Sequence, residues 1–325
     1  MPESAIVVPL DYASHDGKTR INAKLWTSPE FGDGSSADGQ VERPKAVVQI
    51  VHGMAEHIDR YDDLARFLVG RGFIVCAEDH IGHGGSAASP AEFGHMPAHG
   101  GKDILIGDVH TLRRMVSELF AGVPYVMYGH SMGSFIVRAY LARHGDGLAA
   151  CVLSGTGNVP EMLSKGGRTL ARMLAAMRGE RHRSPLIDGM GAGGYGKQIA
   201  NARTHLDWLS TDDAVVDAYM ADDRCGFMFT VGGYATLLDL TAEVVTPECA
   251  ARVPKSVPVL FVAGDGDPVG DMGKGVKAAA KLLHDAGVQQ VDCKIYPGMR
   301  HEIHNEKGYQ QVYDDIASWV LAHVL

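Results

Sequence analysis

A serine between two glycines is the residue best placed to do covalent chemistry, in the segment Gly129-His130-Ser131-Met132-Gly133. The apolar run 123–127 before it predicts a buried strand, and residues 135–143 after it predict a helix. A Gly-x-Ser-x-Gly turn between a strand and a helix holds its serine in a strained conformation with the hydroxyl exposed. The same turn places the Met132 amide at a helix N-terminus, facing any negative charge on a bound carbonyl oxygen.

A serine hydroxyl is a weak nucleophile unless a neighbouring base accepts its proton. Asp265 and Asp267 follow the apolar run 257–264, and His301 and His304 follow an expected last strand at 290–296. Serine, acid and histidine therefore occur in that order, which is not the order of chymotrypsin or subtilisin. Because active groups collect at the carboxyl ends of parallel strands, all three can meet at one edge of a sheet.

Within this set we assign Ser131 as the nucleophile, His301 as the base and Asp267 as the acid that orients the imidazole. Asp267 is preferred because a Pro-Val pair follows it, and His301 because its turn better matches the loop expected there. Asp265 and His304 remain the alternative acid and base.

The segment His52-Gly53-Met54, after an expected strand at 46–51, supplies the second candidate for an oxyanion donor. A His-Gly loop at this place offers a backbone N–H, here that of Met54, and its glycine lets the backbone approach the substrate. His52 and His57 lie close enough in sequence to suggest a metal, but no third ligand stands at a suitable spacing. The His-x-x-His of residues 80–83 lies in a glycine-dense stretch that favours a tight supporting turn. We expect no metal and no cofactor.

Alternating strands and helices must position these residues. Residues 5–12 and 19–27 predict an edge hairpin, and 28–44 an exposed loop. Strands at 46–51, 73–77, 123–127 and 149–154 alternate with helices at 62–70, 104–119 and 135–143. Strands at 257–264 and 290–296 then alternate with a helix at 272–287 and a final helix to 325. This order predicts a mostly parallel sheet covered by helices on both faces.

The strand–helix alternation breaks between residues 158 and 245, where no clean strand occurs. We interpret 158–245 as an inserted, mainly helical cap, and 1–157 with 246–325 as the core. The segment 189–194 matches Gly-x-Gly-x-x-Gly, but it follows no convincing strand and opens no convincing helix. A dinucleotide site is therefore not expected there.

The first helix of the cap is amphipathic and basic. Its apolar face carries Leu170, Met173, Leu174 and Met177, and the opposite face carries Lys165, Arg168 and Arg172. We favour packing of the apolar face on an acyl tunnel, with the arginines in solvent. Such a helix also allows transient contact with a membrane or micelle surface. The expected cap contacts with substrate are Met162, Leu170, Met173, Leu174 and Met177.

Composition narrows the class of protein. The 325 residues are 46% hydrophobic and 21% charged, which is ordinary for a globular enzyme, and the net charge of −9 argues against nucleic-acid binding. No apolar run approaches the length of a membrane span, and the first residues lack a basic region of the signal-peptide kind. Five scattered cysteines favour free thiols, so a cytoplasmic location is expected. The sequence does not indicate an oligomeric state.

Five segments carry a family resemblance: HGMAEHIDRY, DHIGHGGS, GHSMGS, GDGDPV and MRHEIHNE. Together they resemble the monoacylglycerol lipase and lysophospholipase branch of the α/β-hydrolases, which is serine aminopeptidase-like. Even the cap segment DWLSTDDAVVDAYMADDRCGF is similar to bacterial members. The resemblance implies an α/β-hydrolase fold, the triad Ser131, Asp267 and His301, and oxyanion amides at Met54 and Met132.

The function that the resemblance implies is hydrolysis of single-chain acyl esters, monoacylglycerol first and lysophospholipid second. An aminopeptidase or amidase is the alternative enzyme, with Glu161, Asp188 or Asp207 holding the substrate amine. A non-catalytic scaffold of the same fold is a third interpretation, but such proteins commonly lose a triad member or the oxyanion loop, and here every part is present.

Overall fold

The computed structural model describes residues 5–31 and 43–325. Eight strands form one sheet in the order β1-β2-β4-β3-β5-β6-β7-β8. They are β1 (Ile6–Ala13), β2 (Arg20–Thr27), β3 (Ala46–Val51), β4 (Phe73–Glu78), β5 (Tyr125–His130), β6 (Ala150–Ser154), β7 (Val259–Gly264) and β8 (Val291–Tyr296). The β1–β2 and β2–β4 pairs are antiparallel, and the pairs from β4 to β8 are parallel. The expected mostly parallel sheet is confirmed.

The edge hairpin forms as the alternating pattern predicts, with Ile6 opposite Thr27 and Ala13 opposite Arg20. The expected loop 28–44 begins with a short 3-10 helix at Pro29–Phe31, and its residues 32–42 lie outside the described ones. The strand expected at 123–127 extends three residues further, through His130. This extension brings the strand end directly to Ser131.

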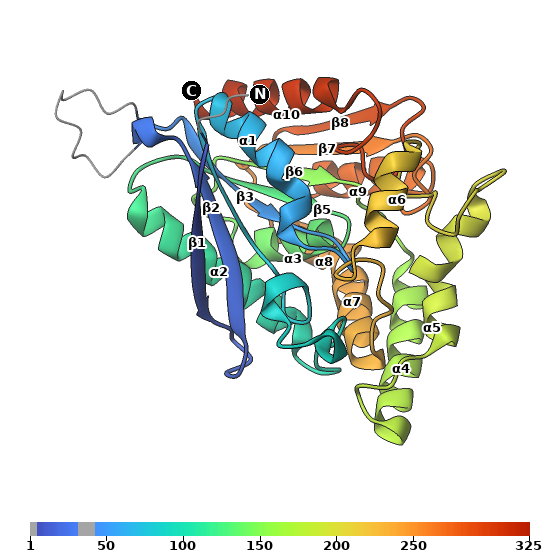
Figure 1. Cartoon of the computed structure of the whole chain (residues 1–325). Coiled ribbons are helices and arrows are strands. Elements are labelled where there is room, and N and C mark those ends of the chain that lie inside the picture. Colours follow the sequence, from blue (N-terminus) through green and yellow to red (C-terminus); the bar gives the residue numbers. More distant parts are fainter. Residues whose placement is uncertain (1–4, 32–42) are drawn as a thin grey trace.

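Helices cover both faces of the sheet (Figure 1). One face packs on α1 (Asp62–Gly70) and α10 (Tyr309–Val324), and the other on α2 (Gly101–Leu119), α3 (Met132–His144) and α9 (Lys274–Asp285). The central strands are buried along their whole length, because both of their faces are covered in this way. Val47 and Ile74 point into one core, and Val48 and Val75 into the other, as the two-residue strand period requires.

Helices alone fill the segment between β6 and β7. They are α4 (Glu161–Arg178), α5 (Pro185–Met190), α6 (Asp213–Ala221), α7 (Val231–Val244) and α8 (Pro247–Ala251), with a 3-10 turn at Ala192–Gln198. Residues 158–245, called the insertion below, are all described and contain no strand. In Figure 1, α4, α5 and α6 stand to the right of the sheet.

A buried arginine joins the two ends of the insertion. Arg138 of α3 is 3% exposed, and its guanidinium donates to the carbonyl oxygens of Gly157 (2.9 Å) and Val244 (2.8 Å). These bonds satisfy carbonyl groups that would otherwise be buried without a partner. The contact supports our division at 158 and 245, which remains a proposal.

No helix in 5–31 or 43–325 combines the length and the apolar character needed to cross a membrane.

Candidate active site

Ser131 occupies the turn between β5 and α3 in a strained conformation, with φ 53° and ψ −120°. Strand and helix nearly touch there: a Cβ on Gly129 would lie 2.6 Å from the Gly133 carbonyl oxygen, and one on Gly133 only 1.9 Å from that of Val51. The Ser131 amide donates to Ser154 O of β6 at 2.9 Å. The close contacts with α3, β3 and β6 therefore require glycine at positions 129 and 133. They also fix the direction of the Ser131 side chain.

His301 and Asp267 form a buried pair on the loops after β8 and β7. His301 Nδ1 lies 3.0 Å from Asp267 Oδ2, and the two residues are 2% and 0% exposed. Burial lowers the pKa of His301, but the charge and hydrogen bond of Asp267 raise it more, so the pKa is above the usual value. The other Asp267 oxygen accepts from Val269 N at 2.9 Å, which holds the carboxylate in place.

Asp265 and His304, the alternative acid and base, lie in different surroundings from Asp267 and His301. Asp265 is exposed and accepts a hydrogen bond from Gly298 N at 2.7 Å. His304 stacks on Tyr61, with ring centroids 4.9 Å apart, and neither of its ring nitrogens has a hydrogen-bond partner. Burial lowers the pKa of His304 to about 3, so its ring is neutral at pH 7. Neither residue makes a carboxylate–imidazole pair like that of Asp267 and His301.

Ser131 and His301 line the same cavity. The His301 ring packs between Trp208 and His130, with centroid distances of 5.0 and 4.8 Å. Within the described residues the Ser131 hydroxyl makes no hydrogen bond. Catalytic hydrogen bonds are often long or absent before substrate enters, so this does not argue against the predicted serine–imidazole pair.

The oxyanion loop, residues 52–57, passes beside the serine. A Cβ on Gly53 would lie 3.0 Å from the Ser131 Cβ, so only glycine fits at this approach. Met54 and Met132 both line the cavity. In the described parts of the chain neither of their amides donates to a protein acceptor, so both are available to a substrate oxygen.

A buried ion network, not anticipated from the sequence, joins the oxyanion loop to the histidine loop. Glu56 accepts from Gly53 N (2.5 Å), Tyr61 Oη (2.8 Å) and Arg60 Nη1 (2.9 Å). Arg60 also makes a two-fold hydrogen bond with Glu302, at 2.6 Å for each contact. Burial raises the pKa of Glu302, but the Arg60 charge lowers it more, to about 2, so this carboxylate is ionised. The network links the residue beside His301 to the loop that carries the Met54 amide.

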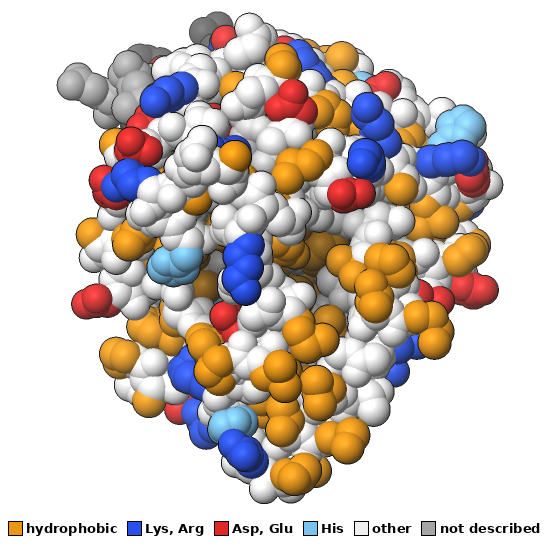
Figure 2. All heavy atoms as spheres, turned by 90° about the vertical axis from the view of Figure 1, so that its right-hand side faces the viewer, with side chains coloured by type: hydrophobic (Ala, Val, Ile, Leu, Met, Phe, Trp, Pro, Cys, Tyr) orange, Lys and Arg blue, Asp and Glu red, His pale blue; other side chains and the backbone are white. Residues whose placement is uncertain are grey.

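A cavity of about 490 Å³ leads to Ser131. Figure 2 faces the side formed by the insertion and shows a central hollow with apolar side chains inside it, and gathered beside and below it. Most apolar side chains of its wall come from α3 and from the insertion, and Met54, Ala55 and Val269 come from loops of the core. They include Phe135, Leu163, Leu170, Ile187, Met190, Trp208, Phe227 and Leu238. This wall suits a hydrocarbon chain.

Only one of the five expected cap contacts, Leu170, lines this cavity. Met162, Met173 and Met177 are exposed, and Leu174 is half-buried against the core. Sequence reasoning missed Leu163, Ile187 and Met190, which do line it. Leu163 lies two turns before Leu170 on α4, so helical spacing could have found it, whereas Ile187 and Met190 lie on the short helix α5 and their spacing gave no signal.

Helix α4 is rotated from the favoured expectation, so that Leu170 and Leu174 still pack inward but Met173 and Met177 do not. Arg168 and Arg172 pair with Asp239 of α7, at 2.8 and 2.5 Å, instead of standing in solvent. Two charge-assisted contacts to one buried carboxylate outweigh the burial of two flexible methionines. Met173 and Met177 consequently face outward.

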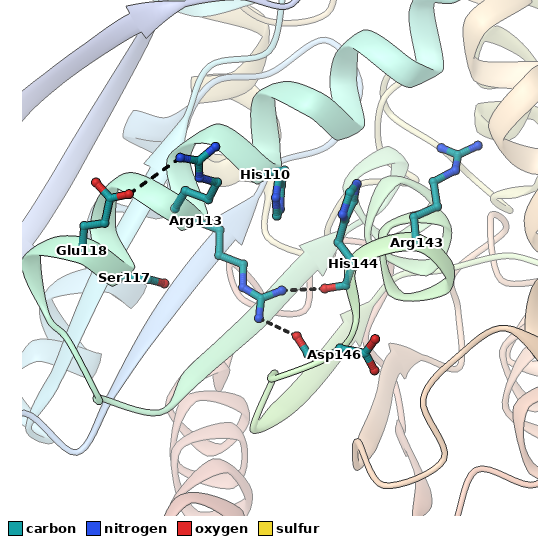
Figure 3. A pocket seen from close by; sticks show the side chains of 8 residues that line it. His110, Arg113, Ser117, Glu118, Arg143, His144 and Asp146 are labelled. Carbon is teal, nitrogen blue, oxygen red and sulfur yellow. Dashed lines mark hydrogen bonds and ion pairs between the residues drawn. The ribbon is translucent and has the colours of Figure 1, made fainter.

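A second hollow, of about 500 Å³, lies between α2 and the end of α3 (Figure 3). Its arginines already have protein partners: Arg113 donates to the carbonyl oxygens of His144 and Asp146, Arg114 pairs with Glu118, and Arg143 pairs with Glu243. Ser117 also lines this hollow, but among the described residues its hydroxyl has no histidine partner. Among the described residues, neither histidine of this hollow, His110 or His144, forms an imidazole–carboxylate pair like that of His301 and Asp267.

The chain is similar to known proteins over most of its length. A family model described as serine aminopeptidase, S33, matches residues 42–308. The monoacylglycerol lipase of Mycolicibacterium smegmatis is 30% identical over 283 residues, 86% of this chain and 90% of that protein. The human monoglyceride lipase is 28% identical over 291 residues, 85% of this chain and 82% of that protein.

The chain is also similar to a solved structure, a highly thermostable carboxyl esterase from Bacillus coagulans in complex with glycerol. The two are 31% identical, with 98% of this chain and 99% of that one covered, and a TM-score of 0.86. The expected fold is confirmed by this likeness.

Proposed function

The chain belongs to the serine aminopeptidase S33 family of α/β-hydrolases and is a serine carboxylic ester hydrolase; from this premise we propose that it cleaves single-chain acyl esters, foremost monoacylglycerols, with Ser131, His301 and Asp267. The observation that carries the proposal is the apolar cavity that ends at Ser131 beside a buried imidazole–carboxylate pair. The names of the relatives above support the substrate class.

In the proposed reaction His301 Nε2 accepts the Ser131 proton while Oγ attacks the ester carbonyl carbon. The amides of Met54 and Met132 bind the oxygen that becomes negative. His301 then gives its proton to the leaving alcohol, and an acyl-enzyme remains. Water, deprotonated by His301, attacks the acyl carbon, and Ser131 leaves with the proton as the fatty acid is released. Asp267 stabilises the imidazolium at both steps.

The charges of the cavity wall favour a neutral head group. Its charged side chains are the carboxylates of Glu56, Asp188 and Glu302, and no lysine or arginine of the described residues lines the wall. Arg60 lies behind the wall and is already paired with two of these carboxylates. The phosphate of a lysophospholipid therefore finds no free cation, whereas glycerol hydroxyls can donate to carboxylate or carbonyl oxygens.

The aminopeptidase alternative keeps one candidate of three. Asp188 lines the cavity, where Tyr234 Oη donates to it. Glu161 is paired with Lys165 at 2.5 Å, and Asp207 accepts from Thr204 Oγ1 at 2.5 Å; neither lines the cavity. An acid close to the acyl site allows amine binding, so this activity is tested alongside the ester.

The decisive experiment compares kcat/KM for a monoacylglycerol, a lysophosphatidylcholine with the same acyl chain, and proline p-nitroanilide. We expect the monoacylglycerol to be preferred over the lysophospholipid by tenfold or more, in the range that one unpaired buried charge costs. A preference for the anilide would establish the aminopeptidase instead, and equal rates on both lipids would remove the head-group argument.

We also infer transient contact between the insertion and a lipid surface. Six large apolar side chains on α4 and α5 are exposed, at 57–77%: Met162, Leu163, Met173, Met177, Leu186 and Met190. Two of them, Leu163 and Met190, also line the cavity, so the apolar surface continues into its mouth. An exposed apolar patch joined to an acyl site suits a lipid aggregate from which the substrate is withdrawn.

A further inference from the structure

A histidine, a carboxylate and a thiol come together behind the oxyanion loop. His57, Asp222 and Cys225 each offer one ligand atom, and these atoms lie within 4.8 Å of one another. In the part of the chain that the structure describes, no other three such side chains meet this closely. None of the three lines the catalytic cavity, although their chain neighbours Glu56 and Gly226 do. The cluster is adjacent to the proposed active site and separate from it.

We propose that His57, Asp222 and Cys225 bind a divalent cation of the Zn²⁺ type, with a fourth position open to water. Imidazole nitrogen, thiolate sulfur and carboxylate oxygen are the three donors that Zn²⁺ prefers in proteins. Hard cations such as Mg²⁺ avoid sulfur, so the thiol selects against them. The two anionic ligands balance the charge of the ion.

The cluster needs only small movements to reach tetrahedral geometry. His57 Nε2 and Asp222 Oδ2 are 2.8 Å apart, and two ligands of one Zn²⁺ stand about 3.3 to 3.8 Å apart. Asp222 has a side chain that is 29% exposed, which gives the ion a route from solvent. Arg224 now pairs with Asp222 at 3.1 Å, but it also pairs with Asp59 at 2.9 Å. If Asp222 binds a metal instead, Arg224 therefore keeps its ion pair with Asp59.

The unused nitrogen of His57 supplies an independent indication. His57 is 2% exposed, and its Nδ1 has no hydrogen-bond partner. That atom lies 3.7 Å from Asp59 Oδ2. A histidine that binds metal through one nitrogen usually gives its other N–H to a carboxylate, which fixes the ring. A slight turn of the His57 ring completes that arrangement.

A bound ion would join two segments that are distant in sequence. His57 ends the oxyanion loop, and Asp222 and Cys225 follow α6 of the insertion. These segments already meet at the carbonyl oxygen of Ala55, which accepts from Tyr219 Oη at 2.8 Å and from Gly226 N at 2.9 Å. The metal would add a further connection between the oxyanion loop and the insertion.

The test is titration of the full-length protein with Co²⁺, which replaces Zn²⁺ and absorbs light when a thiolate binds it. We expect a thiolate-to-cobalt charge-transfer band that saturates at one equivalent and disappears when Zn²⁺ is added. The exposed Cys293 lies outside the cluster, so Cys293→Ser must keep the band. Cys225→Ser must lose it.

Asp222→Asn provides a second variant that keeps the thiol and the shape of the side chain. We expect the apparent Kd for Co²⁺ to rise by about tenfold or more in this variant. This variant also tests the proposed metal site if Cys225→Ser does not fold. The absence of a thiolate band in the wild-type protein, its persistence in Cys225→Ser, or an unchanged Kd in Asp222→Asn would each overturn the proposal.

Discussion

Backbone strain at single residues gathers around the proposed catalytic groups. In the described residues five non-glycine positions have a left-handed φ, and four of them flank the site: Ala55, Ser131, Asp271 and Met272. Ala55 lies in the oxyanion loop, and Asp271 and Met272 follow Asp267. Such conformations persist only where surrounding contacts enforce them, and they concentrate at functional sites.

The protonation state of His301 sets the expected pH dependence. Burial lowers the pKa of His301, but Asp267 raises it more, to above the usual value; the ring takes up a proton as the pH falls through that pKa, and a protonated ring cannot act as base. We expect kcat/KM for a p-nitrophenyl acyl ester to fall about tenfold per pH unit below that pKa.

Asp267→Asn removes the charge that holds this proton. We expect the acid limb of the pH profile to move to lower pH, and kcat to fall by about 10³ to 10⁴, because the correct tautomer is lost. An unchanged limb in this variant would show that another group controls the profile. Asp265→Asn serves as the control, since Asp265 is exposed and bonded to Gly298 N.

The proposed triad residues were within reach of the sequence because each lies in the segment just after a predicted strand, in a fixed chain order. The Arg60–Glu302 contact was not, because these residues are 242 positions apart. Both lie in segments that carried the family resemblance, so a signal existed at Glu56, Arg60 and Glu302. Nothing in their local spacing revealed that they meet.

Among the contacts between elements, the Arg60–Glu302 ion pair is the one that we expect to affect stability and kcat most. Glu302→Gln leaves Arg60 with Glu56 alone and should lower the free energy of unfolding by about 3 kcal/mol. Because Glu302 adjoins His301, kcat should fall while KM changes little. Asp314→Asn is the matched control, since Asp314 pairs with Arg71 at the surface; it should cost less than about 1 kcal/mol.

Denaturant unfolding and ester kinetics on both variants measure these effects. Equal losses of stability in the two variants would contradict a special role for the buried network. A change confined to KM would place Glu302 in substrate binding, and not in positioning the histidine loop.

Elements of the core were predictable, and the packing of the insertion was not. The helix at 62–70 and the strand at 46–51 have the bounds that their patterns gave. The rotation of α4 depends on Asp239, which lies 71 positions beyond Arg168. An amphipathic pattern shows that two faces differ, but a distant carboxylate decides which face turns inward.

At the scale of the whole molecule, the insertion concentrates exposed apolar surface near the cavity mouth, on a chain with a net charge of −9. Met177→Gln combined with Leu186→Gln should weaken binding to neutral phosphatidylcholine vesicles by about tenfold, as two buried side chains lose transfer energy. Hydrolysis of a water-soluble short-chain ester should be unchanged.

Leu119→Gln is the control for this effect, because Leu119 is similarly exposed, at 62%, but ends α2 and so lies outside the insertion. Vesicle co-sedimentation compares the two proteins. Equal binding of both to the vesicles would contradict lipid contact through α4 and α5.

The central claim is that Ser131 carries the acyl group of a monoacylglycerol, and trapping that group tests it most directly. The enzyme is mixed with a monoacylglycerol, quenched in acid within milliseconds, and examined by mass spectrometry of the intact protein and its peptides. We predict one added acyl mass, located on the peptide that contains Ser131, and none in Ser131→Ala, whose kcat should fall by about 10⁴ or more. An acyl group on another residue, or a Ser131→Ala protein that hydrolyses the ester at the wild-type rate, would contradict the account.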